Sequence, residues 1–373
     1  MTDFAFYGFR DGPGGLPQVM RNLMNHLVSQ NFKVDLLLHH INPAELAPLD
    51  KRVRPVKLAG CGLPTRSRAL LRYLKKNRPQ TLMTNREPAN RVVWLTLRKL
   101  KTADRPRFVA RVGMTVSAAL KRRNFWKRSL RQWSMRICYR SADAVIANAE
   151  DVARDLEKWI AVPKAKIRVL PNPTVDSTLF EEAGHKLEHA WLQNNSIPVI
   201  IAVGRLARQK DYPTLLKAFA ALQGQPARLL ILGEGKERPH LQKLIADLRI
   251  GDRAELVGYV ANPFAWMARA QVFVLASAWE GSPNVLIQAL ALGLPSVATD
   301  CPGGNRDILA QGRYGPLVET GNWHGLARAL QQTLAAPLPP EFLRQAVTVY
   351  QVENAAKAYL KVLLPACPEE KNS

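Results

Sequence analysis

The sequence predicts an α/β protein built from two Rossmann-like, doubly wound domains. Its 373 residues exceed the length at which a single hydrophobic core usually stops growing. Hydrophobic residues make up 47% and charged residues 22%, which is typical of a globular protein. Short apolar runs alternate with amphipathic segments in both halves of the chain, which favours parallel sheets covered by helices.

The N-terminal domain is expected over residues 1–175. A strand at 4–9, a glycine-rich turn at 12–15 and an amphipathic helix at 19–28 open it. Four further apolar runs are strand candidates, and most are separated by helical patterns: Val34–Leu38, Thr81–Thr84, Arg107–Val112 and Ala144–Ala147. This alternation predicts one parallel sheet.

A proline-rich segment, Val169–Pro173, and a polar stretch to about Ser196 predict the connection between the domains. The second domain is expected over residues 196–340. Its strand candidates again alternate with helical runs: Val199–Val203, Arg228–Leu232, Ala254–Val257, Val272–Leu275 and Ser296–Ala298. Open parallel sheets of this kind bind ligands beyond the carboxyl ends of their strands.

Nearly all of the net positive charge lies in the first half of the chain. Residues 1–175 contain 34 Lys and Arg against 12 Asp and Glu, and the rest contain 19 against 18, within a net charge of +23. This asymmetry indicates an anionic partner for the first half. The segment Lys121–Arg140 interleaves cations with Trp126 and Trp133, which favours a helix lying on an anionic membrane surface. A solvated helix face and nucleic-acid binding are the alternatives, although no nucleic-acid module is recognisable.

The predicted location is the cytoplasm. The first residues lack a basic leader and a long apolar stretch, so no signal peptide is expected. No apolar run approaches the roughly 18 to 20 residues that cross a bilayer. The four cysteines have neither disulfide-framework nor metal-ligand spacing, as expected in a reducing compartment.

The most informative segment runs from Ser277 to Thr299. It reads as a strand end, a turn containing Gly and Pro, and a helix that opens near Asn284, whose free N–H groups can bind phosphate or hydroxyl oxygens. Glu280 in the turn can accept hydrogen bonds from sugar hydroxyls. By itself, such a turn also fits a surface loop before a core helix.

The complete segment resembles the Glu-x7-Glu region of the retaining family 4 glycosyltransferases, which have the GT-B fold. Three other stretches resemble that family in the same order along the chain. They are the Gly-rich stretch Gly12–Gly15, the pair 142–148 with 167–173, and the Gly-Arg-Leu...Lys segment 202–219. The resemblance implies two Rossmann-like domains facing a central cleft, with the last helix, 341–364, packing back on the first domain.

The resemblance implies three catalytic residues. Arg205 and Lys210 hold the donor diphosphate and stabilise the charge that develops on the leaving group, while Glu280 contacts the donor sugar. No metal ion or other cofactor is then required. The remaining residues expected to bind the donor share positions at strand ends or at the opening helix: Gly14, Gly15, Gly204, Gly233, Tyr259, Ser282, Asn284, Val285, Leu286 and Gln288.

The sequence departs from the family at two places. Gln288 replaces the second acidic residue, so an amide can accept one ribose hydroxyl but the charge-assisted contact is lost. The stretch Phe108–Thr115 lacks the histidine that many members carry, so no acceptor base is identified and the leaving phosphate is expected to act as the base. The glycines at 12–15 lack the G-x-G-x-x-G spacing of a dinucleotide site.

The resulting expectation is a hexosyltransferase that uses a nucleoside-diphosphate sugar, UDP favoured over GDP, with retention. The expected acceptor is a lipid-linked saccharide or polysaccharide, in lipopolysaccharide or exopolysaccharide synthesis. The enzyme is expected to be peripheral on the inner face of the cytoplasmic membrane, with no specific nucleic acid as a partner. A non-catalytic glycosyltransferase-like scaffold, suggested by Gln288, and a basic nucleic-acid-binding protein are the alternatives.

Overall fold

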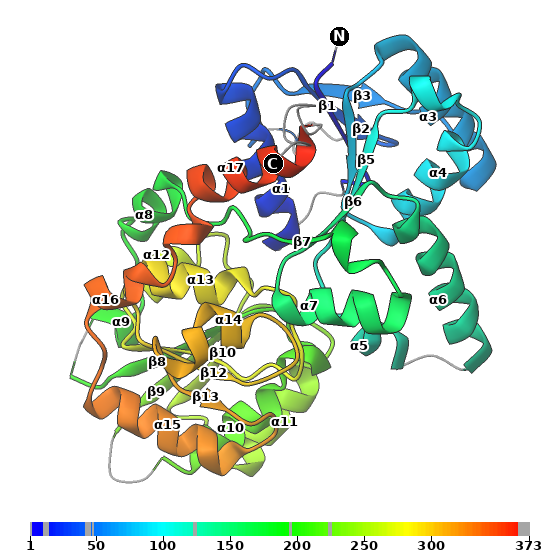
Figure 1. Ribbon diagram of the computed structural model, residues 1–373. Helices are drawn as coiled ribbons and strands as arrows, with labels where there is room; N and C mark the ends of the chain where they lie inside the picture. The colour runs from blue at the N-terminus through cyan, green and yellow to red at the C-terminus, as the bar shows by residue number, and fades with distance from the viewer. Residues whose placement is uncertain are drawn as a thin grey trace, which may run out of the picture. The chain divides into compact units, whose positions relative to one another are not determined.

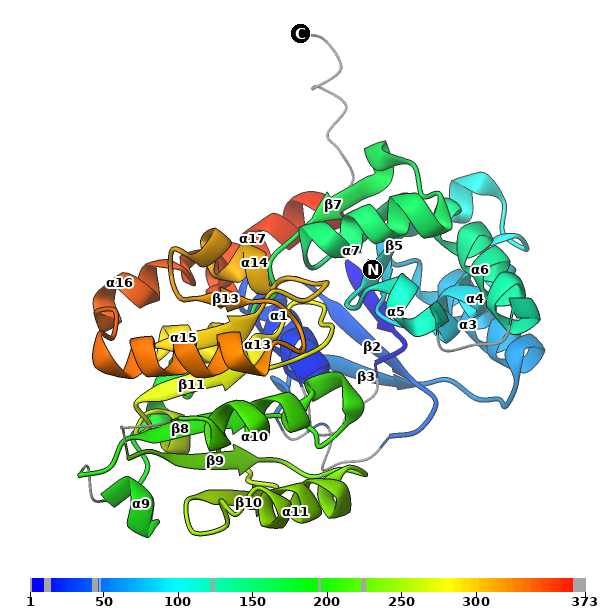
Figure 2. The ribbon, with the colours of Figure 1, turned by 90° about the horizontal axis from the view of Figure 1, so that it is seen from below.

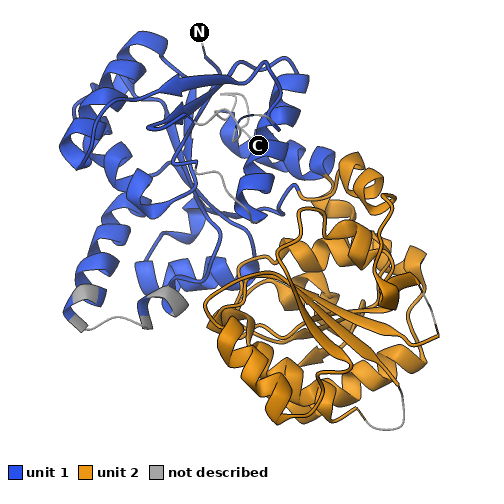
Figure 3. Ribbon diagram, turned by 180° about the vertical axis from the view of Figure 1, so that it is seen from behind, with its two compact units in different colours: residues 1–173, 352–373 blue, residues 174–351 orange. Residues whose placement is uncertain are grey.

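The computed structural model describes residues 2–9, 15–41, 46, 48–121, 125–193, 196–222 and 226–364. The chain divides into two compact units (Figure 3). Unit 1 contains the described residues of 1–173 together with 352–364, and unit 2 contains those of 174–351. Each unit is built around its own parallel sheet. The predicted fold class, two doubly wound α/β domains, is therefore confirmed.

Unit 1 has a seven-stranded sheet in the order β3-β2-β1-β4-β5-β6-β7, and every neighbouring pair is parallel. Its strands are β1 (Phe4–Tyr7), β2 (Val34–Leu38), β3 (Arg54–Lys57), β4 (Thr81–Thr84), β5 (Arg107–Val112), β6 (Ala144–Ala147) and β7 (Ile167–Val169). Its helices are α1 (Gly15–Ser29), α3 (Leu63–Asn77), α4 (Glu87–Leu97), α5 (Val116–Lys121), α6 (Phe125–Arg140), α7 (Glu150–Asp155) and α17 (Val352–Leu363).

Helices cover both faces of this sheet (Figure 1). Because both faces are buried, the central strands are apolar along their whole length rather than alternating. One face packs against α3, α4, α6 and α7, and the other against α1 and α17.

The last helix of the described chain, α17, belongs to unit 1. Its residues Ala356, Tyr359 and Leu363 are buried with side chains of α1. The side chains of Thr81 and Arg107 donate hydrogen bonds to carbonyls at its end, over 2.6 and 3.0 Å. The helix expected over 341–364 is in fact two helices, since a segment without regular α-helix separates α17 from α16 (Pro340–Gln345), which lies in unit 2.

Unit 2 has a six-stranded parallel sheet in the order β10-β9-β8-β11-β12-β13. Its strands are β8 (Val199–Val203), β9 (Arg228–Leu232), β10 (Ala254–Gly258), β11 (Val272–Leu275), β12 (Ser296–Thr299) and β13 (Leu317–Val318). Its helices are α8 (Ser177–Ala183), α9 (Ala190–Gln193), α10 (Tyr212–Ala220), α11 (Arg238–Asp247), α12 (Phe264–Met267), α13 (Asn284–Ala291), α14 (Asn305–Ile308), α15 (Trp323–Ala335) and α16.

The second sheet is also covered on both faces. Side chains of α10, α11 and α15 form the core on one face, and those of α8, α12, α13 and α16 form it on the other. Figure 2 shows α10 and α15 lying along the strands of this sheet. The segment 174–193, expected to be a connection, starts unit 2 and contains two helices, α8 and α9. In the part of the chain that the structure describes, no helix is both long enough and apolar enough to cross a bilayer.

Candidate functional site

The loops that follow β8 and β9 contact each other through their backbones. Gly204 N donates a hydrogen bond to Leu232 O over 2.9 Å, directly before Gly233. A Cβ atom on Gly233, whose φ is +141°, would lie 2.0 Å from the Gly204 carbonyl oxygen. Only glycine fits there, because any side chain would push the two loops apart.

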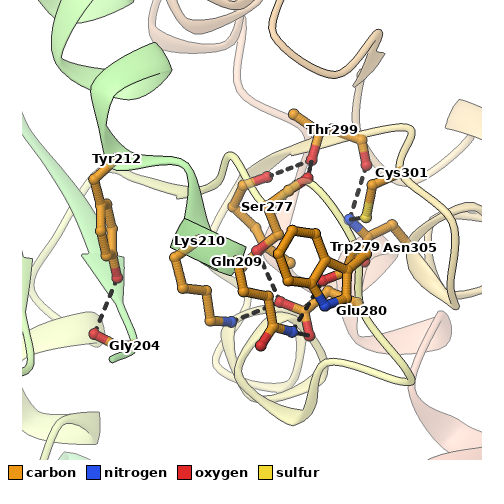
Figure 4. Close-up of polar contacts among 11 residues, drawn as sticks. Gly204, Gln209, Lys210, Tyr212, Ser277, Trp279, Glu280, Thr299, Cys301 and Asn305 are labelled. Atoms are coloured by element: carbon orange, nitrogen blue, oxygen red, sulfur yellow. Dashed lines mark hydrogen bonds and ion pairs between the residues drawn. The ribbon is translucent and has the colours of Figure 1, made fainter. Parts of the chain in front are cut away.

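The side chain of Lys210 packs against Gly204, the residue directly after β8. The 3-10 turn Arg208–Lys210 is followed by Asp211 in the left-handed region, and α10 then begins. A Cβ atom on Gly204 would lie 2.9 Å from Lys210 Cε, so the glycine makes room for the lysine stem. The Tyr212 hydroxyl donates a hydrogen bond to Gly204 O over 3.1 Å (Figure 4). The sequence therefore places Lys210 at the carboxyl end of the sheet.

Lys210 forms an ion pair with Glu280, which follows β11. Lys210 Nζ lies 2.7 Å from Glu280 Oε1, and only 14% of the lysine side chain and 9% of the glutamate side chain are exposed. Ser277 Oγ donates a hydrogen bond to the same carboxylate oxygen over 2.7 Å, and Gln209 Nε2 donates to Glu280 Oε2 over 3.3 Å (Figure 4). The glutamate is thus held by a cation and two neutral donors.

The backbone around Glu280 is fixed by a second group of contacts. Glu280 N donates to Pro302 O over 2.9 Å, and Thr299 Oγ1 donates to Ser277 O over 2.6 Å. A Cβ atom on Gly303 would lie 2.7 Å from Glu280 O. Asn305 Nδ2 in turn donates to Thr299 O over 2.8 Å. The loop after β12 therefore holds the Glu280 loop in one position.

Burial also sets the protonation of two neighbours. It raises the pKa of the Cys301 thiol to about 12, with the Glu280 charge as the second cause. Burial likewise raises the pKa of the Tyr212 hydroxyl, again with a contribution from Glu280. Both groups are neutral near pH 7, so neither offers an ionised nucleophile. The charged groups of the cluster are Lys210 and Glu280.

The start of α13 lies next to this cluster in the sequence. No side chain forms a capping hydrogen bond at Pro283, the residue before the helix. The N–H groups of Leu286 and Ile287 donate to Pro283 O over 3.1 and 3.4 Å. Thr174 Oγ1 donates to Asn284 Oδ1 over 3.3 Å at the first residue of the helix. Of the other predicted residues here, Val285 is half-buried, and Ser282, Leu286 and Gln288 are buried.

Arg205 and Tyr259 are the exposed members of the predicted set in unit 2. Arg205 follows Gly204, and its side chain has no hydrogen-bond or ion-pair partner among the residues that the structure describes. Tyr259 follows β10 and is 63% exposed. Together with Gly204, Gly233, Lys210 and Glu280, these residues lie after strands of one sheet, at the edge where parallel sheets bind ligands.

The N-terminal glycines are placed differently. Gly15 does not lie in a turn but is the first residue of α1 in unit 1, because Leu16 and Pro17 continue directly into the helix and Pro is favoured in a first turn. Gly14 lies outside the described residues. Gly15 therefore belongs to unit 1, whereas Gly204, Gly233, Lys210 and Glu280 belong to unit 2.

Two family models match the chain. The model described as "Glycosyltransferase Family 4" matches residues 13–177, and the model described as "Glycosyl transferases group 1" matches residues 197–336. The chain belongs to glycosyltransferase family 4. Its architecture is that of the GT-B glycosyltransferases. The first model matches most of unit 1, and the second contains Arg205, Lys210 and Glu280.

Relatives of this glycosyltransferase act in several polysaccharide pathways. It is 28% identical, over 97% of both chains, to the N-acetylgalactosamine-N,N'-diacetylbacillosaminyl-diphospho-undecaprenol 4-alpha-N-acetylgalactosaminyltransferase of Campylobacter jejuni. It is 31% identical to the lipopolysaccharide core biosynthesis glycosyltransferase LpsE of Rhizobium meliloti over 53% of this chain and 55% of that protein. The structure of Anabaena HepE in complex with UDP-glucose matches with a TM-score of 0.80 at 17% identity, covering 97% and 99% of the chains.

Two members of this glycosyltransferase's site were not predicted from the sequence, Ser277 and Gln209. Both donate hydrogen bonds to Glu280. The signal available for Gln209 is its position directly before Lys210, which places it in the same turn. Among the described residues, no group of three or more His, Cys, Asp or Glu side chains could hold a metal ion.

Proposed function

We propose that this glycosyltransferase transfers a hexosyl unit, with retention, from a UDP-sugar to a lipid-linked or polysaccharide acceptor. The observation that carries the proposal is the Lys210–Glu280 pair with an unpartnered Arg205 at the same sheet edge. Retention and the preference for UDP over GDP rest on the resemblance to the family. The pathway is proposed to be lipopolysaccharide or exopolysaccharide synthesis.

The charges of these side chains suit a diphosphate leaving group. The Lys210 ammonium has three N–H donors. One of them donates a hydrogen bond to Glu280, so two N–H groups can donate to phosphate oxygens. Arg205 adds a planar fork that can bind two phosphate oxygens at once. The two cations offset the negative charge that develops as the glycosidic bond breaks, and the proposed reaction then needs no metal ion or other cofactor.

Glu280 is proposed to act in two ways. Its carboxylate holds Lys210 in place, and Oε2, whose hydrogen bond from Gln209 is long at 3.3 Å, has capacity for a sugar hydroxyl. The donor diphosphate is proposed to accept the acceptor's proton. The N–H groups at the start of α13 and the amide of Gln288 would serve the remaining donor oxygens.

The nature of the acceptor is proposed from the relatives. The Campylobacter jejuni relative carries diphospho-undecaprenol in its name, and the Rhizobium meliloti relative is named for the lipopolysaccharide core. Both names refer to saccharides that are built on lipids. By the same reasoning, the enzyme is proposed to be peripheral on the cytoplasmic face of the membrane.

Helix α6 is the proposed membrane contact. Trp126, Leu130 and Trp133 are 82%, 68% and 60% exposed, and their spacing places them on one face of the helix. Exposed aromatic and aliphatic side chains on a basic helix favour insertion at an anionic interface. Two of its cations already have protein partners, because Arg131 pairs with Glu87 at 3.1 Å and Arg136 donates to Ile160 O over 3.3 Å. Residues 122–124, near the start of the predicted segment Lys121–Arg140, lie outside the described residues.

Calorimetric titration with UDP, GDP and ADP, without added metal, tests the donor site. We expect saturable binding of UDP, and at least roughly tenfold weaker binding in Arg205→Ala, because a charge-assisted contact is lost. Lys217→Ala, which removes an exposed cation from α10 in the same unit, is the matched control and should bind UDP as the wild type does. Absence of binding to every nucleotide would instead support the non-catalytic scaffold.

A further inference from the structure

Unit 1 contains a buried cation that has no acidic partner. Arg111, on β5, is 2% exposed. Its Nε donates to the Tyr359 hydroxyl over 3.0 Å and its Nη2 donates to Asn172 Oδ1 over 2.6 Å, but Nη1 has no hydrogen-bond partner among the described residues. No carboxylate among the described residues forms an ion pair with it. A buried charge without a counter-charge is costly, so this guanidinium is suited to an anion supplied from outside the chain.

Other unpartnered polar atoms lie at the same edge of the sheet. Thr115, just beyond the end of β5, is 2% exposed, and Asn148, directly after β6, is 5% exposed. In the part of the chain that the structure describes, neither Thr115 Oγ1 nor Asn148 Oδ1 has a hydrogen-bond partner. Buried polar atoms normally find a partner, so two of them at the sheet edge that also holds an unsatisfied guanidinium point to a ligand.

The strand register places Arg111 and Asn148 close together, and Thr115 follows Gly113 by two residues. β5 and β6 are neighbours, with Arg111 opposite Ile146 and Val112 opposite Ala147. Just beyond the strands, Asn148 Nδ2 donates to Gly113 O over 3.4 Å. A Cβ atom on Gly113 would lie 3.1 Å from Arg111 Nη1 and 3.8 Å from Asn148 Nδ2. The glycine therefore leaves the guanidinium uncrowded at the carboxyl end of the sheet, where such sheets bind ligands.

We propose that Arg111, Thr115 and Asn148 bind a saccharide phosphate or diphosphate, which is the anionic part of a lipid-linked acceptor. Arg111 Nη1 and the Thr115 hydroxyl donate to phosphate oxygens, and Asn148 Oδ1 accepts from a saccharide hydroxyl. The assignment to the acceptor rests on the proposed function. The phosphate site narrows the proposed acceptor from a lipid-linked saccharide or a polysaccharide to a saccharide that is linked to its lipid through phosphate.

A purely structural role for Arg111 would be to anchor α17 through Tyr359. Arg107 has this anchoring role. Its Nε donates to Val362 O of α17 over 3.0 Å, and it lies on the same face of β5 as Arg111. Arg107 is only partly buried, at the opposite end of β5. Arg107→Gln is therefore the matched control for Arg111→Gln, since each removes one cation and one contact with α17.

The test is a titration of the full chain with inorganic pyrophosphate in the presence of saturating UDP, which occupies the donor site. We expect a pyrophosphate site that is at least about tenfold weaker in Arg111→Gln and several-fold weaker in Thr115→Val, since hydrogen bonds to a charged group are lost. Arg107→Gln should leave it unchanged. Thr115→Val removes only an unpartnered hydroxyl and keeps the test valid if Arg111→Gln fails to fold.

A second arm uses farnesyl diphosphate to identify the source of the anion. Competition between farnesyl diphosphate and pyrophosphate for the Arg111-dependent site is expected for a lipid-linked acceptor. Pyrophosphate binding that farnesyl diphosphate cannot displace would assign the site to a free anion and overturn the acceptor assignment. UDP binding without a pyrophosphate site would refute the Arg111 site alone, whereas pyrophosphate binding without UDP binding would refute the donor site alone.

Discussion

Lys210 and Glu280 are 70 residues apart in the sequence, and their charged atoms lie 2.7 Å apart. They follow β8 and β11, which are adjacent strands of the unit 2 sheet. The pair therefore joins two loops across the carboxyl edge of that sheet. A second link between the same loops is the hydrogen bond from Ala278 N to Gln209 O over 2.8 Å.

Because the two side chains share one ion pair, their substitutions should not act independently. Glu280→Gln and Lys210→Gln are each expected to lower UDP-sugar hydrolysis by about 10² to 10³, as for other lost transition-state contacts. The double variant should lose little more than either single variant, because the pair acts as a unit. Initial rates of UDP release measure this. Losses that multiply in the double variant would contradict a shared role.

Gln288 offers a test of the second acidic position. Gln288→Glu is expected to tighten UDP binding by up to about tenfold, since a carboxylate can accept charge-assisted hydrogen bonds from ribose hydroxyls. Pyrophosphate has no ribose, so its affinity for the donor site of the same variant should not rise. Titration of both ligands separates the two effects. An equal change for UDP and pyrophosphate would show that the side chain does not act on the ribose.

Gly233 is predicted to be essential for stability. Gly233→Ala would place a Cβ atom 2.0 Å from Gly204 O at a φ of +141°, so we expect it to lower the free energy of unfolding by about 2 to 5 kcal/mol. Gly251→Ala is the control, because its nearest contact would be Ile245 Cγ2 at 3.9 Å. Chemical denaturation followed by circular dichroism compares the two. Equal stabilities would contradict the close approach of the two loops.

The exposed apolar face of α6 is predicted to bind membranes. Replacing Trp126, Leu130 and Trp133 with Ser should weaken binding to phosphatidylglycerol vesicles by at least about tenfold, because the apolar area available for burial is lost. Phe180→Ser, which removes a 49% exposed aromatic side chain from α8, should leave vesicle binding unchanged. Co-sedimentation gives both values. Unaltered binding of the triple variant would rule out this face as the contact.

The buried strands and the edge strand β10 could be predicted, whereas the other edge strands, β3, β7 and β13, could not. Strands such as Val199–Val203 and Val272–Leu275 are continuous apolar runs because both faces of a parallel sheet are covered. β3 (Arg54–Lys57) has mostly exposed, charged residues, and β13 has only two residues, so neither has a hydrophobic pattern to detect. β7 is a short edge strand before the proline-rich segment. Edge strands depend on pairing with a neighbour, which the local sequence does not encode.

The site was predictable in its residue types and less so in its contacts. Arg205, Lys210 and Glu280 could be named because the spacing around them resembles the family. The burial of Glu280 and its bonds to Ser277 and Gln209 depend on how three loops meet, which no local pattern records. Arg111 is a similar case, because in the sequence it is one cation among many in a basic half.

The membership of α17 in unit 1 has a consequence for synthesis on the ribosome. Unit 2 is a continuous stretch, 174–351, and all of it emerges before Val352. Unit 1 needs α17 to cover Val19, Met20 and Leu23 of α1, so its core cannot close until the end of that helix has left the exit tunnel. The first unit to be translated is therefore the last to be completed, and a nascent chain stalled before Val352 leaves an apolar surface for chaperones to bind.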